Sequence, residues 1–272
     1  MAVTPSTISP RFQEPVVVKI LSGEHFSHES VRALAHIVSK FFTTLELQNV
    51  KEQELHFKEL GSRKILLIIP GASDLKAIDL SLEQQAVINL YAGLGAIKVL
   101  AVCAGAFYAS KSIIYLGEKR HSEKKFFLFG GSACGPAFMG EDPKWNISSQ
   151  SVSLEGVMPR ETGYATFING GFFVPDSQLI EGKDFVTLSR YEKLPAQPIA
   201  ALACLPGVNG NFHAVLMGPH LEFDAQDECF ESLKTAFAHK ATFVEKVVED
   251  LHATSEFRRH FFQQVFSRLG FK

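Results

Sequence analysis

The sequence predicts an α/β fold with a mostly parallel, doubly wound sheet, additional β-hairpins and C-terminal helices. Three observations predict it. In the first 110 residues, apolar strand-like runs alternate with helical segments, the order typical of a doubly wound sheet. Between residues 126 and 217, short apolar runs are separated by Gly, Pro and Asn, a pattern of hairpins. From residue 226 to residue 269, apolar residues return to helical spacing.

Length and composition restrict the class of protein. At 272 residues the chain can bury a sizeable core, and a net charge of -2 gives no footprint for nucleic acid or an acidic membrane surface. Neither is therefore an expected partner. The four cysteines include no C-x-x-C pair and are too few for a disulfide framework in a chain of this length. A reducing, cytoplasmic setting is expected, and no apolar run approaches the roughly 18 residues that span a bilayer.

The chain is expected to form a single domain preceded by a tail. Residues 1–15 are polar, end at Pro15 and carry no secretory signal pattern, so they are expected to be flexible. Residues 16–272 contain no internal repeat, low-complexity segment or clear interdomain linker. We therefore expect one domain over residues 16–272.

Strands and helices alternate in the first half of the chain. Ser27 and Ser81 are each placed to cap a following helix. The run 64–70 is continuously apolar, as expected of a central parallel strand covered on both faces. The expected strands here are 16–21, one within 45–57, 64–70 and the run that begins at residue 98.

The second half is expected to add hairpins and then helices. Its strand candidates are residues 126–131, 147–157, 164–173, 185–191, 199–205 and 212–217. Three apolar stripes at helical spacing follow. They consist of Phe230, Leu233 and Phe237, then Val244, Val247, Val248 and Leu251, then Phe257, Phe261, Val265 and Leu269.

Cys103 lies where an apolar strand-like run meets small, helix-compatible residues. Ala101, Ala104 and Gly105 are the small neighbours that a sharp strand-to-helix turn requires. Such a turn holds one side chain above the sheet, and the helix N-terminus stabilises a thiolate there. The alternative is a buried structural cysteine, since free cysteine is among the most buried residue types.

A cysteine nucleophile needs a base, a group that orients the base, and donors for the oxyanion. His220 and Glu222 follow an apolar strand, and in extended backbone their side chains share one face. The carboxylate could bond one imidazole nitrogen and leave the other to take the thiol proton. By itself a His-x-Glu pair after a strand is a weak signal, because most such histidines have no function.

Cys103, His220 and Glu222 lie within a set of five segments that occur in a fixed order along the chain. These segments are residues 69–75, 102–110, 131–138, 167–171 and 218–223. Together with the ending 259–271, they resemble the family of the biotin-protein ligase N-terminal domain. The resemblance covers nearly the whole chain. It implies a flavodoxin-like, class I glutamine amidotransferase-like fold, whose triad is Cys, His and Glu in that chain order.

The resemblance also implies roles for individual residues. Cys103 would be the nucleophile, His220 the general base and acid, and Glu222 the orienting carboxylate. The backbone N–H groups of Gly71 and Ala104 would bind the oxyanion. The expected function is a cysteine-dependent amidase or amidotransferase-like hydrolase of a small amide or ester, acting through a thioester and without a cofactor.

A non-catalytic module that holds a small ligand or a protein partner is the alternative. The chain has no Gly-Arg-Gly-Arg stretch, the adenylate-binding loop expected of a biotin ligase, so ligase activity is not expected. Three positions depart from the family pattern: Ala101 and Ala72 replace glycines, and Leu221 replaces a proline. If position 72 required a positive φ, alanine would be strained there and the oxyanion hole incomplete.

Four residues are candidates for contact with a substrate: Ala72, Tyr108, Cys134 and Asn169. For Cys134 a packing role is favoured, and a helix tyrosine and a turn asparagine are commonplace. Glu24 is a candidate partner of Cys103 only if His220 is not, by similarity to ThiJ/PfpI-type proteins. Cys204 and Cys229 are expected to be structural, and the scattered histidines predict no metal site.

Overall fold

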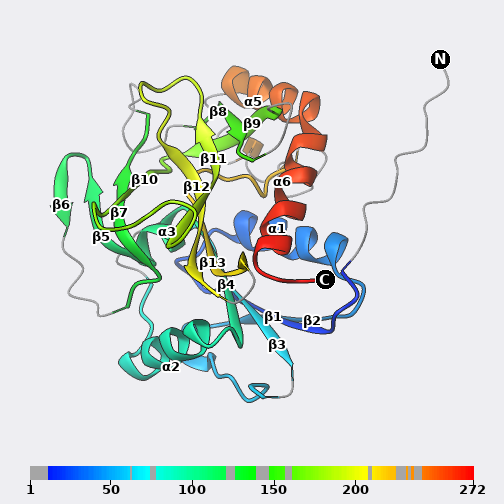
Figure 1. Ribbon diagram of the computed structural model, residues 1–272. Helices are drawn as coiled ribbons and strands as arrows, with labels where there is room; N and C mark the ends of the chain where they lie inside the picture. Colours follow the sequence, from blue (N-terminus) through cyan, green and yellow to red (C-terminus); the bar gives the residue numbers. More distant parts are fainter. Residues whose placement is uncertain are drawn as a thin grey trace.

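A large mixed sheet organises the molecule, as the computed structural model shows (Figure 1). Its thirteen strands, counted over the described residues, include a path in the order β2-β1-β3-β4-β13-β12-β10-β7-β5-β6, with β11, β8 and β9 branching from β12. The predicted α/β class is confirmed. The described residues are 12–61, 63–73, 78–120, 126–138, 147–156, 161–207, 210–224, 231, 234–235 and 241–272.

The parallel part of the sheet is built from the strands that the apolar runs predict. They are β1 (Val16–Leu21), β2 (Leu45–Val50), β3 (Lys64–Ile69), β4 (Ile97–Val102) and β13 (Phe212–Met217). Every residue of β1, β4 and β13 is buried, because helices cover both faces of these strands. In Figure 1, helices α1 (His28–Phe41) and α6 (Ser255–Arg268) lie on one side and α2 (Leu82–Gly93) on the other.

Antiparallel strands extend the sheet beyond β13. They are β5 (Ser110–Tyr115), β6 (Glu118–Arg120), β7 (Phe129–Gly135), β8 (Ile147–Leu154), β9 (Glu161–Ile168), β10 (Phe172–Pro175), β11 (Phe185–Tyr191) and β12 (Ile199–Pro206), of which β5 and β7 pair in parallel. The strand predicted over residues 164–173 is two strands. The positive φ of 53° at Asn169 ends β9 and turns the chain toward β10.

The predicted helix caps are present. Ser27 accepts a hydrogen bond from the Ser30 N–H at the start of α1, and Ser81 forms a capping box with Gln84 at the start of α2. The helix after Cys103, α3 (Ala104–Tyr108), is only five residues long. It ends early because the next residues, from Ser110, pair with β7 as a strand instead of continuing the helical turn.

The C-terminal helices α5 (Ala241–Ala253) and α6 carry two of the three predicted stripes. The stripe of Phe230, Leu233 and Phe237 lies outside the described residues. Phe266 of α6 packs on Phe41 of α1 with ring centroids 5.3 Å apart. Phe12 joins the same cluster, and its N–H donates to the Phe41 carbonyl over 2.8 Å. In the described part of the chain, no helix is long and apolar enough to cross a membrane.

Candidate active site

The carboxyl ends of three neighbouring parallel strands define the candidate site. β4 pairs with β3 on one side and with β13 on the other, so the chain leaves all three at one edge of the sheet. The segments that follow carry Gly71, Cys103 and His220 respectively. Residues that are more than 100 positions apart in the sequence therefore meet.

Cys103 occupies the predicted strand-to-helix turn in a strained conformation. Its φ is 50° and its ψ is -113°, values that non-glycine residues seldom adopt and that cost about 1–3 kcal/mol. The Cys103 N–H donates to the Met217 carbonyl over 2.8 Å, which fixes the turn to the end of β13. A Cβ at Gly105 would lie 2.2 Å from the Ile69 carbonyl oxygen, so only glycine lets α3 cross the end of β3 here.

His220 is held against Glu222 in the interior. The Nδ1 of His220 lies 2.7 Å from Oε1 of Glu222, and the two side chains are 5% and 0% exposed. Two backbone hydrogen bonds to Thr166, of 2.8 and 3.1 Å, fix the main chain of His220. The ring also stacks on Phe223, at 5.2 Å between centroids. Leu221 therefore leaves the histidine firmly placed despite replacing a proline.

The electrostatic environment of His220 favours its protonated form. Burial alone would lower the pKa of His220, but the negative charges of Glu222 and Cys103, with hydrogen bonds to both side chains, raise the pKa to about 10. The same ring bonds the Glu222 carboxylate at Nδ1 and also has a side-chain hydrogen bond with Cys103. A protonated imidazole beside a cysteine is an arrangement that can stabilise a thiolate.

Ser30 is a member of this cluster that sequence reasoning missed. Its hydroxyl donates to Oε1 of Glu222 over 2.7 Å, and the side chain is fully buried on α1. The signal was available in the sequence. Ser30 lies four residues before Leu34, on the apolar face of the predicted helix, where a polar side chain needs a partner inside the protein.

The conformation of the loop after β3 explains why position 71 needs a glycine and why position 72 accepts an alanine. Neither residue has a positive φ, so Gly71 is not required for an unusual backbone conformation and Ala72 is not strained. Gly71 is required for space, because a Cβ there would lie 2.8 Å from Cε1 of His220 and 3.6 Å from Cβ of Cys103. The difficulty predicted for Ala72 therefore does not arise.

Backbone N–H groups of this loop and of α3 remain available near the thiol. The Gly71 carbonyl accepts the Ser27 N–H over 2.9 Å, so the Ala72 N–H of the same trans peptide points away from Ser27. Ala104 begins α3, where N–H groups have no partner within the helix. Among the hydrogen bonds of the described residues, none engages the N–H of Gly71, Ala72 or Ala104.

The end of β9 contacts the thiol of Cys103. The Sγ of Cys103 donates to the Ile168 carbonyl at 3.7 Å, and Cys103 is only 9% exposed. The next residue, Asn169, was expected to contact a ligand and is thus adjacent to the cysteine in space. A Cβ at Gly218 would lie 1.8 Å from the Gly171 carbonyl oxygen, so glycines allow this segment to approach the chain that leads to His220.

The other predicted residues lie in different surroundings. Tyr108 is buried against Phe126, at 5.4 Å between ring centroids, and burial raises the pKa of its hydroxyl. Cys134 and Cys204 are buried in strands, and burial raises the pKa of each thiol, which suits a packing role. Glu24 is exposed in the turn after β1, while His220 is the residue that bonds Cys103. Cys229 lies outside the described residues.

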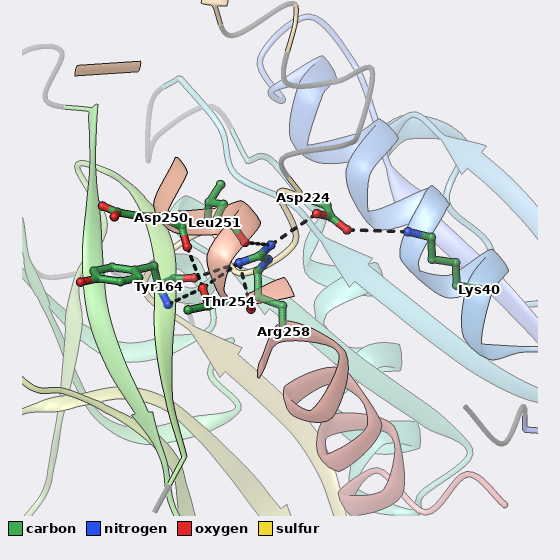
Figure 2. A network of polar contacts seen from close by, with 7 residues as sticks. All are labelled: Lys40, Tyr164, Asp224, Asp250, Leu251, Thr254 and Arg258. Carbon is green, nitrogen blue, oxygen red and sulfur yellow. Dashed lines mark hydrogen bonds and ion pairs between the residues drawn. The ribbon is translucent and has the colours of Figure 1, made fainter. Parts of the chain in front are cut away.

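A buried arginine fixes the segment that carries His220 and Glu222 to the C-terminal helices (Figure 2). Arg258 of α6, whose side chain is 5% exposed, donates to Oδ1 of Asp224 over 3.3 Å and to the Leu251 carbonyl over 2.6 Å. The other carboxylate oxygen of Asp224 lies 3.9 Å from Nζ of Lys40 on α1. Asp224 is thereby held between α1 and α6, two residues after Glu222.

Metal binding would require a group of suitable side chains among the described residues. No group of three or more His, Cys, Asp or Glu side chains there could hold a metal ion.

Comparison with known proteins gives one family and a common fold. A family model described as "Biotin-protein ligase, N terminal" matches residues 16–272. No curated protein matches the chain. A solved glutamine amidotransferase from Thermotoga maritima is 11% identical with a TM-score of 0.59, over 94% of this chain and 98% of its own. Another structure described as a glutamine amidotransferase is 18% identical with a TM-score of 0.49, over 82% and 98%.

Proposed function

The chain belongs to the biotin-protein ligase N-terminal family and has a glutamine amidotransferase-like fold, and on that basis we propose that it is a cysteine-dependent hydrolase of a small amide or ester. Cys103 is the nucleophile, His220 the general base and acid, and Glu222 the group that orients His220. The observation that carries the proposal is the buried imidazole that bonds both the cysteine and the carboxylate.

In the proposed reaction His220 holds the proton of Cys103, so the nucleophile is a thiolate beside an imidazolium before the substrate binds. The thiolate attacks the carbonyl carbon, a C–S bond forms, and the negative charge moves to the carbonyl oxygen. His220 then gives its proton to the leaving amine or alcohol as the C–N or C–O bond breaks, which leaves a thioester. Water, deprotonated by His220, attacks the thioester, and the acid and the free thiol are released.

The oxyanion that forms in each step needs hydrogen-bond donors. The N–H of Ala104 and those of the loop at Gly71 and Ala72 have no partner among the described residues and flank Cys103 in the fold. Loss of one such donor costs about 3 kcal/mol of transition-state stabilisation. We assign the donor role to Ala104 and to this loop, with Asn169 as a candidate contact for the bound substrate.

The substrate class follows from the chemistry and from the burial of Cys103. A cysteine that is only 9% exposed and contacts the Ile168 carbonyl suits a small carboxamide or ester. Glutamine is one candidate, because the names of the solved relatives include glutamine amidotransferase. Fold alone does not choose the substrate. We propose a reducing, cytoplasmic setting, in which the buried free thiols stay reduced.

A second candidate function is suggested by the hydrogen bond that the thiol of Cys103 already makes within the protein. The Sγ of Cys103 already donates to the Ile168 carbonyl, and the residue is only 9% exposed, so a protein in which this thiol does not react is the alternative. In that case the protein is a non-catalytic module that holds a small ligand or a protein partner through the same site.

The test of the proposal is turnover by the full chain. We expect a burst of nitrophenol from p-nitrophenyl acetate, equal to the protein concentration, and ammonia release from at least one member of a panel of glutamine and short carboxamides. The variant Cys103→Ser is expected to give neither signal. The same slow rates in the wild type and in Cys103→Ser would refute the hydrolase and favour the binding module.

A further inference from the structure

Ser30 is placed unusually for a serine in a helix. It lies in the first turn of α1, where its N–H donates to the hydroxyl oxygen of the capping Ser27 over 3.2 Å. Helical serines commonly donate their hydroxyl to the carbonyl four residues earlier. The hydroxyl of Ser30 instead donates to Oε1 of Glu222, 192 residues away in the sequence, at 2.7 Å.

Two donors converge on one carboxylate oxygen. Oε1 of Glu222 bonds both the Ser30 hydroxyl and Nδ1 of His220, each at 2.7 Å. The other oxygen, Oε2, is buried and has no hydrogen-bond partner within the described residues. A buried carboxylate with so few donors depends strongly on each of them. The serine hydroxyl therefore supports the charge of Glu222 and fixes the direction in which Oε1 points.

We propose that Ser30 is a positioning residue for the reaction, because it holds the Glu222 carboxylate in the orientation that directs His220 toward Cys103. The inference rests on the proposed function of these three residues. With its hydrogen bond to Ser30, Oε1 of Glu222 faces Nδ1 of His220. Without it, the carboxylate is free to rotate, and the imidazolium that stabilises the thiolate loses part of its electrostatic support.

The first turn of α1 also contacts the loop that flanks Cys103. The Ser27 N–H donates to the Gly71 carbonyl over 2.9 Å, three residues before Ser30 reaches Glu222. One rigid helical turn therefore sets two parts of the site relative to each other. The direction of the Ala72 N–H and the direction of the Glu222 carboxylate both depend on its position.

None of the charged side chains described near Glu222 duplicates the hydrogen bond from the Ser30 hydroxyl. His220 and, beyond it, Cys103 are its titratable neighbours in the site. On α1, Glu29 accepts from the Ser27 hydroxyl and is not bonded to Glu222. Asp224 is held by Arg258 and Lys40 (Figure 2). Among the described side chains, only Ser30 and His220 donate to Glu222.

The experiment compares the rate of Cys103 alkylation by iodoacetamide, followed by peptide mass spectrometry, in the full chain from pH 5 to pH 9. In Ser30→Ala we expect the rate at pH 6 to fall about 10-fold, since hydrogen bonds to charged groups are worth a factor of this order. Ser39→Ala is the matched control, because Ser39 lies on the same helix and donates to the Ala35 carbonyl. It is expected to keep the wild-type profile.

A double-mutant cycle separates positioning from a general loss of structure. In the Glu222→Gln background, Ser30→Ala is expected to change the pH 6 rate less than about twofold, because the charge that the hydroxyl supports is already gone. Additive losses would overturn the proposal. Ser30→Thr, which keeps a hydroxyl, is expected to restore the profile. Ser30→Cys replaces Ser30→Ala if circular dichroism shows that the alanine variant does not fold.

The outcomes also distinguish this proposal from the proposed function. If wild-type Cys103 is unreactive at pH 6, or if His220→Ala leaves its rate unchanged, both proposals fail. If His220→Ala lowers the rate while folded Ser30→Ala matches the wild type, the role of Ser30 alone is refuted.

Discussion

Replacement of Gly71 by alanine tests the packing at the centre of the site. The added Cβ would lie 2.8 Å from Cε1 of His220 and 3.5 Å from Nε2 of the same ring. Ordinary van der Waals contact begins near 3.4 Å, so the ring or the loop has to move by about 0.6 Å. The loop is also restrained by the hydrogen bond from Ser27 to the Gly71 carbonyl. We therefore expect the ring to carry much of the shift.

A shift of this size changes reactivity more than stability. Misplacement of a reacting group by about 1 Å can cost about 100-fold in rate, whereas overpacking a core site costs about 1–3 kcal/mol. We expect Gly71→Ala to remain folded and to lower the alkylation rate of Cys103 at pH 6 by 10- to 100-fold. The assay is iodoacetamide labelling followed by intact mass spectrometry, with thermal unfolding as the check of folding.

Gly93→Ala is the matched control. Gly93 is the last residue of α2, is exposed, and has no atom within 4 Å of the position where a Cβ would be. Its substitution is expected to leave the labelling rate unchanged. A folded Gly71→Ala protein that labels at the wild-type rate would refute the argument that this glycine makes room for His220.

Three further predictions concern buried charges. Arg258→Met leaves Asp224 without its main partner and should lower the free energy of unfolding in urea by about 3 kcal/mol; no loss would contradict the role of the arginine as a structural link. Burial and the nearby positive charge of Lys64 lower the pKa of Lys98 to about 8, so the charged form of Lys98 destabilises the fold. Lys98→Met should therefore raise the melting temperature by at least about 2 °C below pH 8. This gain should decrease as the pH rises toward 10.5. An equal gain at all pH values would exclude desolvation of the charge as its cause. The raised pKa of His220 contributes stability that is fully present below pH 6.5 and is lost as the pH rises to about 10. In urea unfolding, the free energy by which the wild type exceeds His220→Gln should therefore decrease between pH 6.5 and about pH 10. Below pH 6.5 this difference should stay constant.

The elements that place the site were predictable because their sequence patterns are local. The apolar run before Cys103 and the small residues after it indicated a strand-to-helix turn, and the turn is present with a φ of 50°. The pairing of β4 with β13 was not available from any local pattern, because more than 100 residues separate the two strands. Family resemblance supplied the connection between Cys103 and His220 that periodicity could not supply.

Other features depend on packing that a single sequence does not display. Gly71 was expected to supply an N–H to the oxyanion, and the structure shows that it provides space for an imidazole ring from a distant segment. The role of Ser30 depends on the arrival of Glu222 beside the first turn of α1. The early end of α3 reflects the pairing of β5 with β7, which competes with helix formation from Ser110 onward. In each case a tertiary contact decided what local propensity left open.

The most direct test of the account is the pH dependence of Cys103 alkylation in the wild type and in His220→Ala. For a free thiol with a pKa of about 8.5, the fraction present as thiolate is about 300-fold lower at pH 6 than at high pH. With His220 as an imidazolium partner, we expect the wild-type rate at pH 6 to stay within a few-fold of the rate at pH 8, and His220→Ala to lose about 100-fold over the same interval. A wild-type rate that falls about tenfold per pH unit below pH 8, as in the variant, would contradict the proposed pairing of Cys103 with His220.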